Sequence, residues 1–259
     1  MTEAPEKQPD RPDGERIAKR LSRAGVCSRR EAERWIADGR IIIDGKKISE
    51  PGTLVTEASD IRVDGKPIAA PQATRLWRYH KPAGLICSNS DPQGRPTVFE
   101  RLPKHLPRVM SVGRLDFESE GLLLLTNDGS TARKLELPET GWLRRYRVRM
   151  FGKPTEDDIA ALAKGITVDG MKYGGIEAAI DSAKGRNTWM TVALREGKNR
   201  EVRKVFDHLG YRVNRLIRTA YGPFQLGDLG RGGVEEIPRR ILKDQLGLKA
   251  SHAHRGRQA

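Results

Sequence analysis

The chain has little of several features that mark other protein classes. Only two of its 259 residues are cysteines, Cys27 and Cys87, and their wide separation suggests no disulfide framework. No apolar run approaches the roughly 20 residues of a membrane-spanning helix. Residues 1–14 are polar and charged, unlike a secretory signal. We therefore expect a cytoplasmic protein with no membrane partner and no disulfide scaffold.

Acidic residues are scarce relative to basic ones. The chain has 48 Lys and Arg against 34 Asp and Glu, which gives a formal net charge of +14. Such an excess favours polyanions, because each neutralised phosphate releases condensed counterions. An anionic membrane surface would satisfy the same charge, but no apolar segment accompanies it. The composition therefore indicates a nucleic-acid partner, on a chain long enough for one large or two modest domains.

The first part of the chain predicts a compact module of two helices followed by short strands. A first apolar stripe ends at a glycine, and Ser28 with Glu31 then forms a capping box for a second helix. Residues 41–48 and 61–68 each read as two short strands around an Asp-Gly turn. Residues 1–13 show no apolar periodicity and predict a disordered lead-in.

Basic residues crowd these two helices and the entry to the first strand. They are Arg16, Lys19, Arg20, Arg23, Arg29, Arg30, Arg34 and Arg40. A solvated helical face and a phosphate-binding surface explain such a cluster about equally well.

The most informative run is GRLDFESEGLLLLTNDG at residues 113–129. Its four leucines are too few for a helix and predict a short buried strand closed by a turn. Arg114 and Asp116 then lie on a loop entering a rigid element, which can fix the geometry of a site. On the pattern alone, a surface ion pair beside a strand is the commoner explanation. Ser130 is the predicted cap of the helix that follows.

Two later blocks add candidate site residues. Residues 144–150 alternate strictly and predict a half-buried strand with Tyr146 on its apolar face. Residues 195–210 predict a helix capped by Asn199. The basic side of that helix holds Arg200, Arg203 and Lys204. Taken alone, these are an ordinary core tyrosine and a solvated face. Residues 234–246 predict a closing helix.

The run at 113–129 resembles the central motif of the RNA pseudouridine synthases, in the branch typified by RsuA and RluB. The block at 195–210 is similar to the last motif of that family. The helices and first strand of the amino-terminal module resemble the alpha-L RNA-binding motif, known from a small-subunit ribosomal protein, which precedes the catalytic domain in this branch. The resemblance extends over residues 15–240 in consistent order.

The resemblance implies roles for individual residues. The family has its essential catalytic residue at the position of Asp116, and an arginine that helps to turn the uridine out of its helix at that of Arg114. Tyr146 corresponds to a tyrosine beneath the flipped base, and Arg203 to a basic residue paired with the catalytic aspartate. The reaction needs no cofactor and no metal. The expected RNA-binding residues are Arg16, Lys19, Arg20, Arg23, Arg29, Arg30, Arg40, Lys198, Arg200 and Lys204.

The predicted fold is α+β: a small alpha-L RNA-binding module, then a pseudouridine synthase domain with a mixed, mainly antiparallel sheet flanked by helices. The predicted division is a lead-in at 1–13, the module at 14–70, a linker at 71–75, the catalytic domain at 76–246 and a basic disordered tail at 247–259.

The predicted activity is isomerisation of a specific uridine in ribosomal RNA by a monomer. The sequence GRPTVF at 94–99 is closer to the RluB-like subfamily, which favours 23S over 16S RNA, or a ribosomal subunit precursor, as the partner. Two alternatives remain. One is a non-catalytic RNA-binding assembly factor on the same fold, and the other is a hydrolase that pairs Asp116 with Glu118 or Glu120.

Overall fold

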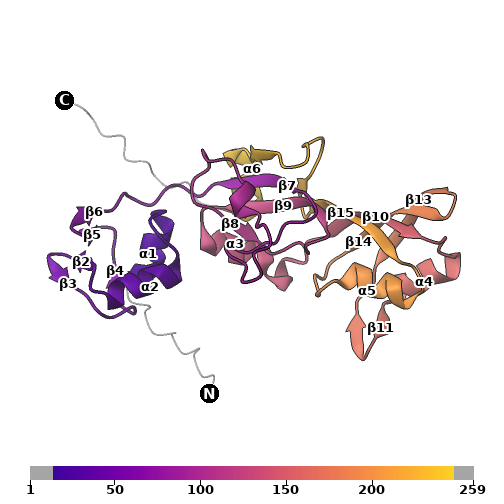
Figure 1. Cartoon of the computed structure of the whole chain (residues 1–259), viewed down its shortest axis with the longest axis horizontal. Helices are drawn as coiled ribbons and strands as arrows, with labels where there is room; N and C mark the ends of the chain where they lie inside the picture. Colours follow the sequence, from indigo (N-terminus) through magenta and orange to yellow (C-terminus); the bar gives the residue numbers. More distant parts are fainter. Residues whose placement is uncertain (1–13, 248–259) are drawn as a thin grey trace, which may run out of the picture. The chain divides into compact units, whose positions relative to one another are not determined.

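The computed structural model describes residues 14–247, so the predicted lead-in and all but the first residue of the predicted tail lie outside the described residues. Contacts divide the chain into two units between Ala73 and Thr74 (Figure 1). Each unit has its own hydrophobic core. No helix of the described residues is long and apolar enough to cross a membrane.

The first unit contains two helices packed on short strands. Its elements are β1 (Glu15–Arg16), α1 (Ile17–Arg23), α2 (Arg29–Ala37), β2 (Ile41–Ile43), β3 (Lys46–Lys47), β4 (Leu54–Val55), β5 (Ile61–Val63) and β6 (Lys66–Pro67). The strands form an antiparallel sheet in the order β3-β2-β5-β6 and a separate β1-β4 pair. Asp44 and Asp64 have φ of 50° and 49°, which the tight turns between paired strands require.

The capping box predicted for α2 is present. The Ser28 hydroxyl accepts a hydrogen bond from the Glu31 backbone N–H at 3.1 Å, and the Glu31 carboxylate accepts one from the Ser28 N–H at 3.3 Å. The β1-β4 pair was not predicted, because strands of two residues are too short to show an alternating pattern.

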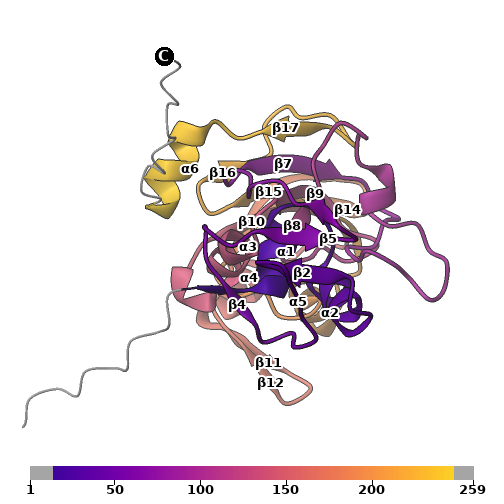
Figure 2. The ribbon, with the colours of Figure 1, turned by 90° about the vertical axis from the view of Figure 1, so that its left-hand side faces the viewer.

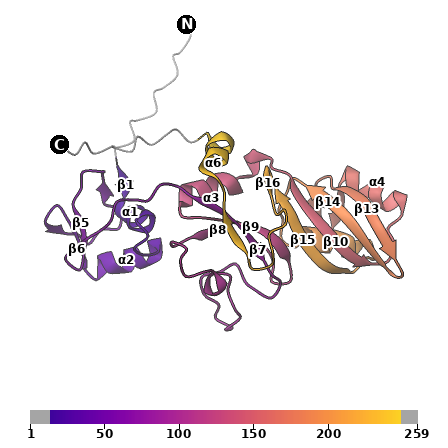
Figure 3. The same cartoon turned by 90° about the horizontal axis from the view of Figure 1, so that it is seen from above.

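The second unit is built on a nine-stranded sheet with the order β13-β14-β10-β15-β9-β7-β17 (Figures 1 and 3). Two short strands pair outside this path, β8 with β9 and β16 with β15. The strands are β7 (Leu76–Lys81), β8 (Met110–Val112), β9 (Glu120–Thr126), β10 (Arg144–Phe151), β13 (Glu177–Lys184), β14 (Asn187–Leu194), β15 (Val213–Tyr221), β16 (Phe224–Gln225) and β17 (Val234–Glu236). All pairs are antiparallel except β9 with β15, so the predicted mixed, mainly antiparallel sheet is confirmed.

Helices cover opposite faces of the two halves of this sheet. They are α3 (Gly129–Glu136), α4 (Glu156–Lys164), α5 (Glu201–His208) and α6 (Arg239–Leu246), with 3-10 turns at Phe99–Arg101 and Pro138–Thr140. A separate hairpin is formed by β11 (Ile166–Val168) and β12 (Met171–Tyr173). Strand β9 sends Leu123 and Leu125 into the core with α4 and α5, and Leu122 and Leu124 into the core with α3 and α6. The alternating side chains of β9 therefore contribute to both cores.

Three predicted helix starts are wrong. The cap of α3 is Asp128, whose carboxylate accepts from the Thr131 N–H at 2.7 Å, and not Ser130. The residue that caps α5 is Arg200, in a left-handed conformation, and not Asn199. The predicted closing helix starts later, at Arg239, because residues 234–236 pair with β7 as the edge strand β17 (Figure 2).

Candidate active site

Asp116 lies on the loop of residues 113–119 that connects β8 with β9. The loop closes on itself through the Ser119 N–H, which donates to the Asp116 carbonyl at 3.0 Å, and the Gly84 N–H donates to the Phe117 carbonyl at 2.7 Å. Directly after the loop, Gly121 has φ of 106°, and a Cβ there would lie 2.3 Å from the Arg218 carbonyl oxygen. The glycine therefore lets β9 approach β15 closely at the end of this loop.

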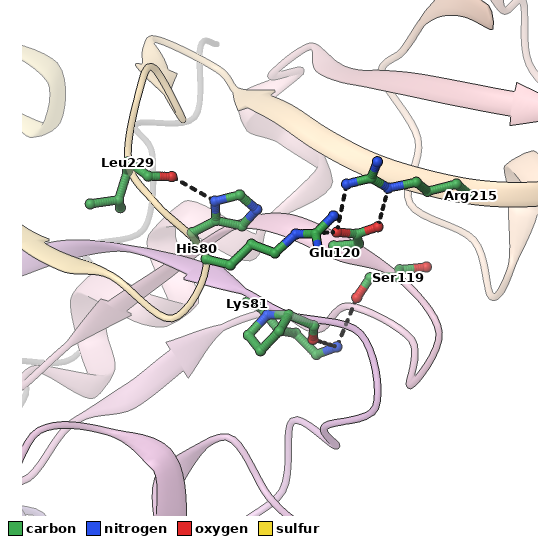
Figure 4. Close-up of polar contacts among 8 residues, drawn as sticks. His80, Lys81, Ser119, Glu120, Arg215 and Leu229 are labelled. Carbon is green, nitrogen blue, oxygen red and sulfur yellow. Dashed lines mark hydrogen bonds and ion pairs between the residues drawn. The ribbon is translucent and has the colours of Figure 1, made fainter.

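Lys81, the last residue of β7, holds this loop from within the protein (Figure 4). Its side chain is fully buried. The Nζ atom donates to the backbone carbonyls of Ser119 at 2.8 Å, Asp116 at 3.0 Å, Pro82 at 3.1 Å and Phe117 at 3.4 Å. Burial lowers the pKa of Lys81 to about 8, although the charges of Asp116 and Glu120 act in the opposite direction.

A cavity of about 560 Å³ opens where the loop meets β10, β15 and the start of α5. Arg114, Asp116 and Tyr146 all line it. Tyr146 reaches it from the buried face of β10 and is 9% exposed. The volume falls in the range of small-molecule sites and can hold a nucleotide. Residues predicted from two separate sequence blocks, Arg114 and Asp116 from one and Tyr146 from the other, thus meet at one site. Lys198 and Arg200 line the same cavity.

Arg203 lies on the other side of the loop from this cavity. Its guanidinium donates to the backbone carbonyls of Val213 at 3.0 Å and Glu118 at 3.3 Å, and Nη1 is 3.9 Å from the Glu118 carboxylate. Burial lowers the pKa of Arg203, and the charge of Glu118 opposes this more strongly than that of Asp116. Among ion pairs of the described residues within 4.0 Å, the acidic partner of Arg203 is Glu118 and not Asp116.

Arg218 lines the cavity but was not among the predicted site residues. It is 4% exposed and lies opposite Tyr146 in the pairing of β15 with β10. Its Nε donates to the Leu122 carbonyl at 2.8 Å, and its guanidinium carbon is 5.1 Å from the centre of the Tyr221 ring. Leu216, Arg218 and Ala220 alternate on the buried side of β15, so Arg218 shares the face that lines the cavity. Which residue of β10 lies opposite Arg218 depends on the strand register, which contains a shift between Arg145 and Tyr146.

The charged residues that line a second cavity, of about 650 Å³, are two carboxylates, Glu118 and Asp207, and four basic side chains. These are Arg200, Arg203, Lys204 and Arg212. Arg200 lines both cavities, so basic groups continue from one side of the Asp116 loop to the other. Their charges favour an anionic ligand such as a phosphate.

Glu201 fixes the segment before α5 that lines the first cavity. Its side chain is buried, and one carboxylate oxygen accepts from the Lys198 N–H at 2.9 Å. The Lys198 ammonium pairs with Glu196 at 2.7 Å. Burial raises the pKa of Glu201 to about 7, and the nearby charge of Glu196 acts in the same direction. Within the described residues, no group of three or more His, Cys, Asp and Glu side chains could hold a metal ion.

The predicted RNA-binding residues of the first unit fall into two sets, those that approach a carboxylate and those that are exposed. Three approach the carboxylate of Glu15, at 3.6 Å for Lys19, 3.6 Å for Arg20 and 2.8 Å for Arg23. Arg40 pairs with Asp64, and its guanidinium carbon lies 4.5 Å from the centre of the Trp35 ring. The predicted RNA-binding residues Arg16, Arg29 and Arg30 are exposed.

Comparisons with known proteins agree with both units. A model of the family described as RNA pseudouridylate synthase matches residues 75–208, and an S4 domain model matches residues 15–61. A solved structure described as a pseudouridylate synthase has the same fold, with a TM-score of 0.62 and 23% identity over 89% of this chain and 99% of the other.

The sequence relatives are more similar. A protein of Rickettsia prowazekii named as an uncharacterised RNA pseudouridine synthase is 46% identical over 231 residues, which cover 89% of this chain and 97% of the relative. A Yersinia pestis protein named ribosomal large subunit pseudouridine synthase B is 41% identical over 86% of this chain and 73% of the relative. Together with the matching family model, these relatives show that the chain belongs to the RNA pseudouridine synthases, enzymes that isomerise uridine in RNA.

Proposed function

We propose that the chain isomerises a uridine of ribosomal RNA in the large subunit, and that Asp116 is its essential catalytic residue. The meeting of Arg114, Asp116 and Tyr146 in one cavity is the observation that carries the assignment. The choice of RNA rests on relatives named ribosomal large subunit pseudouridine synthase B in Yersinia pestis and Pasteurella multocida, each 41% identical. A monomer acting in the cytoplasm is part of the proposal.

The chemistry needs one carboxylate and a closed site. The bond from ribose C1′ to N1 of uracil breaks, the base turns, and C1′ rejoins at C5, which then gives up its hydrogen as a proton. The ionised Asp116 either attacks C1′ or removes the 2′ proton. Tyr146 supports the turned base and is the candidate acceptor of the C5 proton. Arg218 supplies a buried positive charge in the same cavity.

The target base must first leave its stack, which costs a few kcal/mol. Arg114 is in position to fill the vacated space, since it borders the cavity on the same loop as Asp116. Arg203 acts from the other side of that loop. Its hydrogen bond to the Glu118 carbonyl fixes the loop, and its attraction to the Asp116 charge helps to orient that carboxylate.

The RNA backbone follows the basic groups around this loop. Lys198, Arg200 and Lys204 line the two cavities and are proposed phosphate contacts. The first unit, proposed to span residues 14–70, adds the exposed Arg16, Arg29 and Arg30. Lys19, Arg20, Arg23 and Arg40 complete the proposed surface, although each approaches a carboxylate in the structure. Residues 71–75 are the proposed linker to a catalytic domain at 76–246.

Tritium release tests this function. Large- and small-subunit transcripts labelled at uracil C5, and the corresponding subunit precursors, are each incubated with the protein. We expect release of tritium to water from large-subunit RNA, because C5 loses its hydrogen on becoming the glycosidic carbon. Release from small-subunit RNA alone contradicts the choice of substrate. Tight, salt-sensitive binding with no release from any substrate supports the non-catalytic assembly factor instead.

A further inference from the structure

The exposed face of β10 carries arginines that the proposed chemistry does not use. Along this strand Tyr146, Val148 and Met150 are buried, whereas Arg145, Arg147 and Arg149 are exposed. Neighbouring side chains of a strand point to opposite faces. The arginines therefore lie on the side of the sheet opposite the catalytic cavity. Helices α4 and α5 cover the face that carries Tyr146, Val148 and Met150, so they do not cover the arginines (Figure 1).

Neighbouring strands extend this basic surface. In the sheet register Arg149 lies between Arg215 of β15 and Trp189 of β14. The guanidinium carbons of Arg147 and Arg215 lie 4.7 Å and 5.9 Å from the centre of a ring of Trp189. We name the set formed by Arg145, Arg147, Arg149, Arg215 and Trp189 the arginine face. Stacking on the tryptophan restricts two of its guanidinium groups before any ligand binds.

The positive charge of this face is only partly compensated. Arg147 lies 3.8 Å from Asp181, and Arg215 lies 2.5 Å from Glu120. In the described part of the chain no carboxylate lies within 4.0 Å of Arg145 or Arg149. Arg149 is directly opposite Arg215 in the sheet, and the charge of Arg215 is offset by Glu120. Arg145 and Arg149 therefore carry the positive charge of this face that is open to a polyanion.

We propose that the arginine face binds backbone phosphates of an RNA segment outside the hairpin that carries the target uridine. This inference rests on the proposed function. Alternate residues of a strand are about 7 Å apart, which is close to the separation of successive phosphates along one RNA strand. Guanidinium groups bind phosphate through two parallel hydrogen bonds. An acidic protein fits less well, because Asp and Glu, the side chains that would pair with these arginines, are depleted from protein interfaces.

The position of the face determines which RNAs use it. A short hairpin with its uridine in the catalytic cavity occupies the opposite side of the sheet from the arginines. Only a longer RNA can contact both sides of the same domain. The arginine face therefore contributes to the affinity for long transcripts and subunit precursors, and leaves the chemical step unchanged.

The test removes the two arginines without a carboxylate partner, in the double variant Arg145→Gln/Arg149→Gln. Its matched control is Lys164→Gln/Arg240→Gln, which loses the same charge at exposed positions on α4 and α6. Affinity is measured over a salt series for the full large-subunit transcript, for the protein-containing subunit precursor and for the shortest hairpin that still releases tritium. Circular dichroism melting curves confirm that both variants are folded.

We expect the double variant to bind the long transcript about tenfold more weakly, with a salt slope lower by up to about 2, because each lost phosphate contact removes up to about 0.9. Hairpin affinity and its tritium-release rate stay at the wild-type level, as do all values for the control. Equal losses on hairpin and transcript, or none on the transcript, overturn the proposal. So does a loss confined to protein-containing subunits, which indicates an acidic protein. If no RNA releases tritium, the proposed activity fails. The affinity of the double variant for the long transcript, compared with that of the wild type and the control, still decides this inference.

Discussion

At the residue scale, Lys81 connects the end of β7 to the loop that carries Asp116. Four backbone carbonyls share its ammonium group, and three of them belong to that loop. Buried carbonyls that lose their donor cost about 1–3 kcal/mol each. The position of the Asp116 backbone therefore depends on a buried side chain that is not among those lining the cavity.

Lys81→Met tests this dependence. We expect a lower free energy of unfolding, by about 3 kcal/mol, and a fall in single-turnover rate of more than tenfold with little change in RNA affinity. Urea unfolding and rapid-quench tritium release measure the two effects. Lys104→Met, at an exposed lysine, is the control. An unchanged rate in Lys81→Met would show that the loop holds its geometry unaided.

Glu201 makes stability depend on pH. Its folded-state pKa of about 7 lies above its usual 4.5, so between these values the folded protein binds more protons than the unfolded chain. The free energy of unfolding therefore falls as pH rises from about 4.5 to 7, by up to about 3 kcal/mol.

Glu201→Gln removes this titration and keeps an acceptor for the Lys198 N–H. Urea unfolding at several pH values between 5 and 7.5 should give a decline for the wild type that is weaker in the variant. Parallel curves for the two proteins contradict the assignment to Glu201.

Sequence patterns predicted the elements that carry Arg114, Asp116 and Tyr146. Arg114 and Asp116 belong to one continuous run, and Tyr146 to a strictly alternating strand, so local sequence determines where they lie. The partner of Arg203 and the position of Arg218 opposite Tyr146 depend on how β9, β10, β15 and α5 meet in space. A motif specifies residue types but not these long-range distances, so the contact of Arg203 with Glu118 was missed.

At the element scale, the parallel pairing of β9 with β15 positions the Asp116 loop. In this pairing Glu120 lies opposite Ile217, and Gly121 lies opposite Arg218. Arg215 of β15 also binds the buried carboxylate of Glu120 (Figure 4). A substitution that separates these strands should therefore disturb both the fold and the loop.

Gly121→Ala is such a substitution, because its Cβ would lie 2.3 Å from a backbone oxygen at φ of 106°. We expect a loss of about 3 kcal/mol in the free energy of unfolding and a slower reaction. Gly129→Ala, at the start of α3 with its nearest neighbour at 3.5 Å, should change stability by less than about 1 kcal/mol. Equal effects of the two changes in urea unfolding would contradict the close approach.

Elements with a strong local signal were predicted, and those that depend on distant partners were not. The leucine run and the alternating arginine strand became β9 and β10. The cap of α2 was correct because both partners of its capping box lie three residues apart. In contrast, residues 234–236 form a strand only because β7 offers them an edge. No local pattern carries that information.

At the scale of the whole molecule, the order of the motifs predicted the fold class correctly. The net charge of +14 indicated a polyanion, but charge alone does not distinguish an enzyme from a binding protein. The nine-stranded order could not be predicted, because its parallel pair of β9 with β15 joins segments almost 100 residues apart. The cavity formed where these strands meet supports the interpretation of the chain as an enzyme rather than a binding protein.

The most direct test of that interpretation compares Asp116→Asn with the wild type in tritium release from C5-labelled large-subunit RNA. The substitution replaces a carboxylate by an amide of similar shape, so RNA affinity and its salt dependence should stay at the wild-type level. We predict no release from the variant in a single turnover under conditions in which the wild type completes its reaction. Release at the wild-type rate would contradict the role of Asp116 and with it the proposed mechanism.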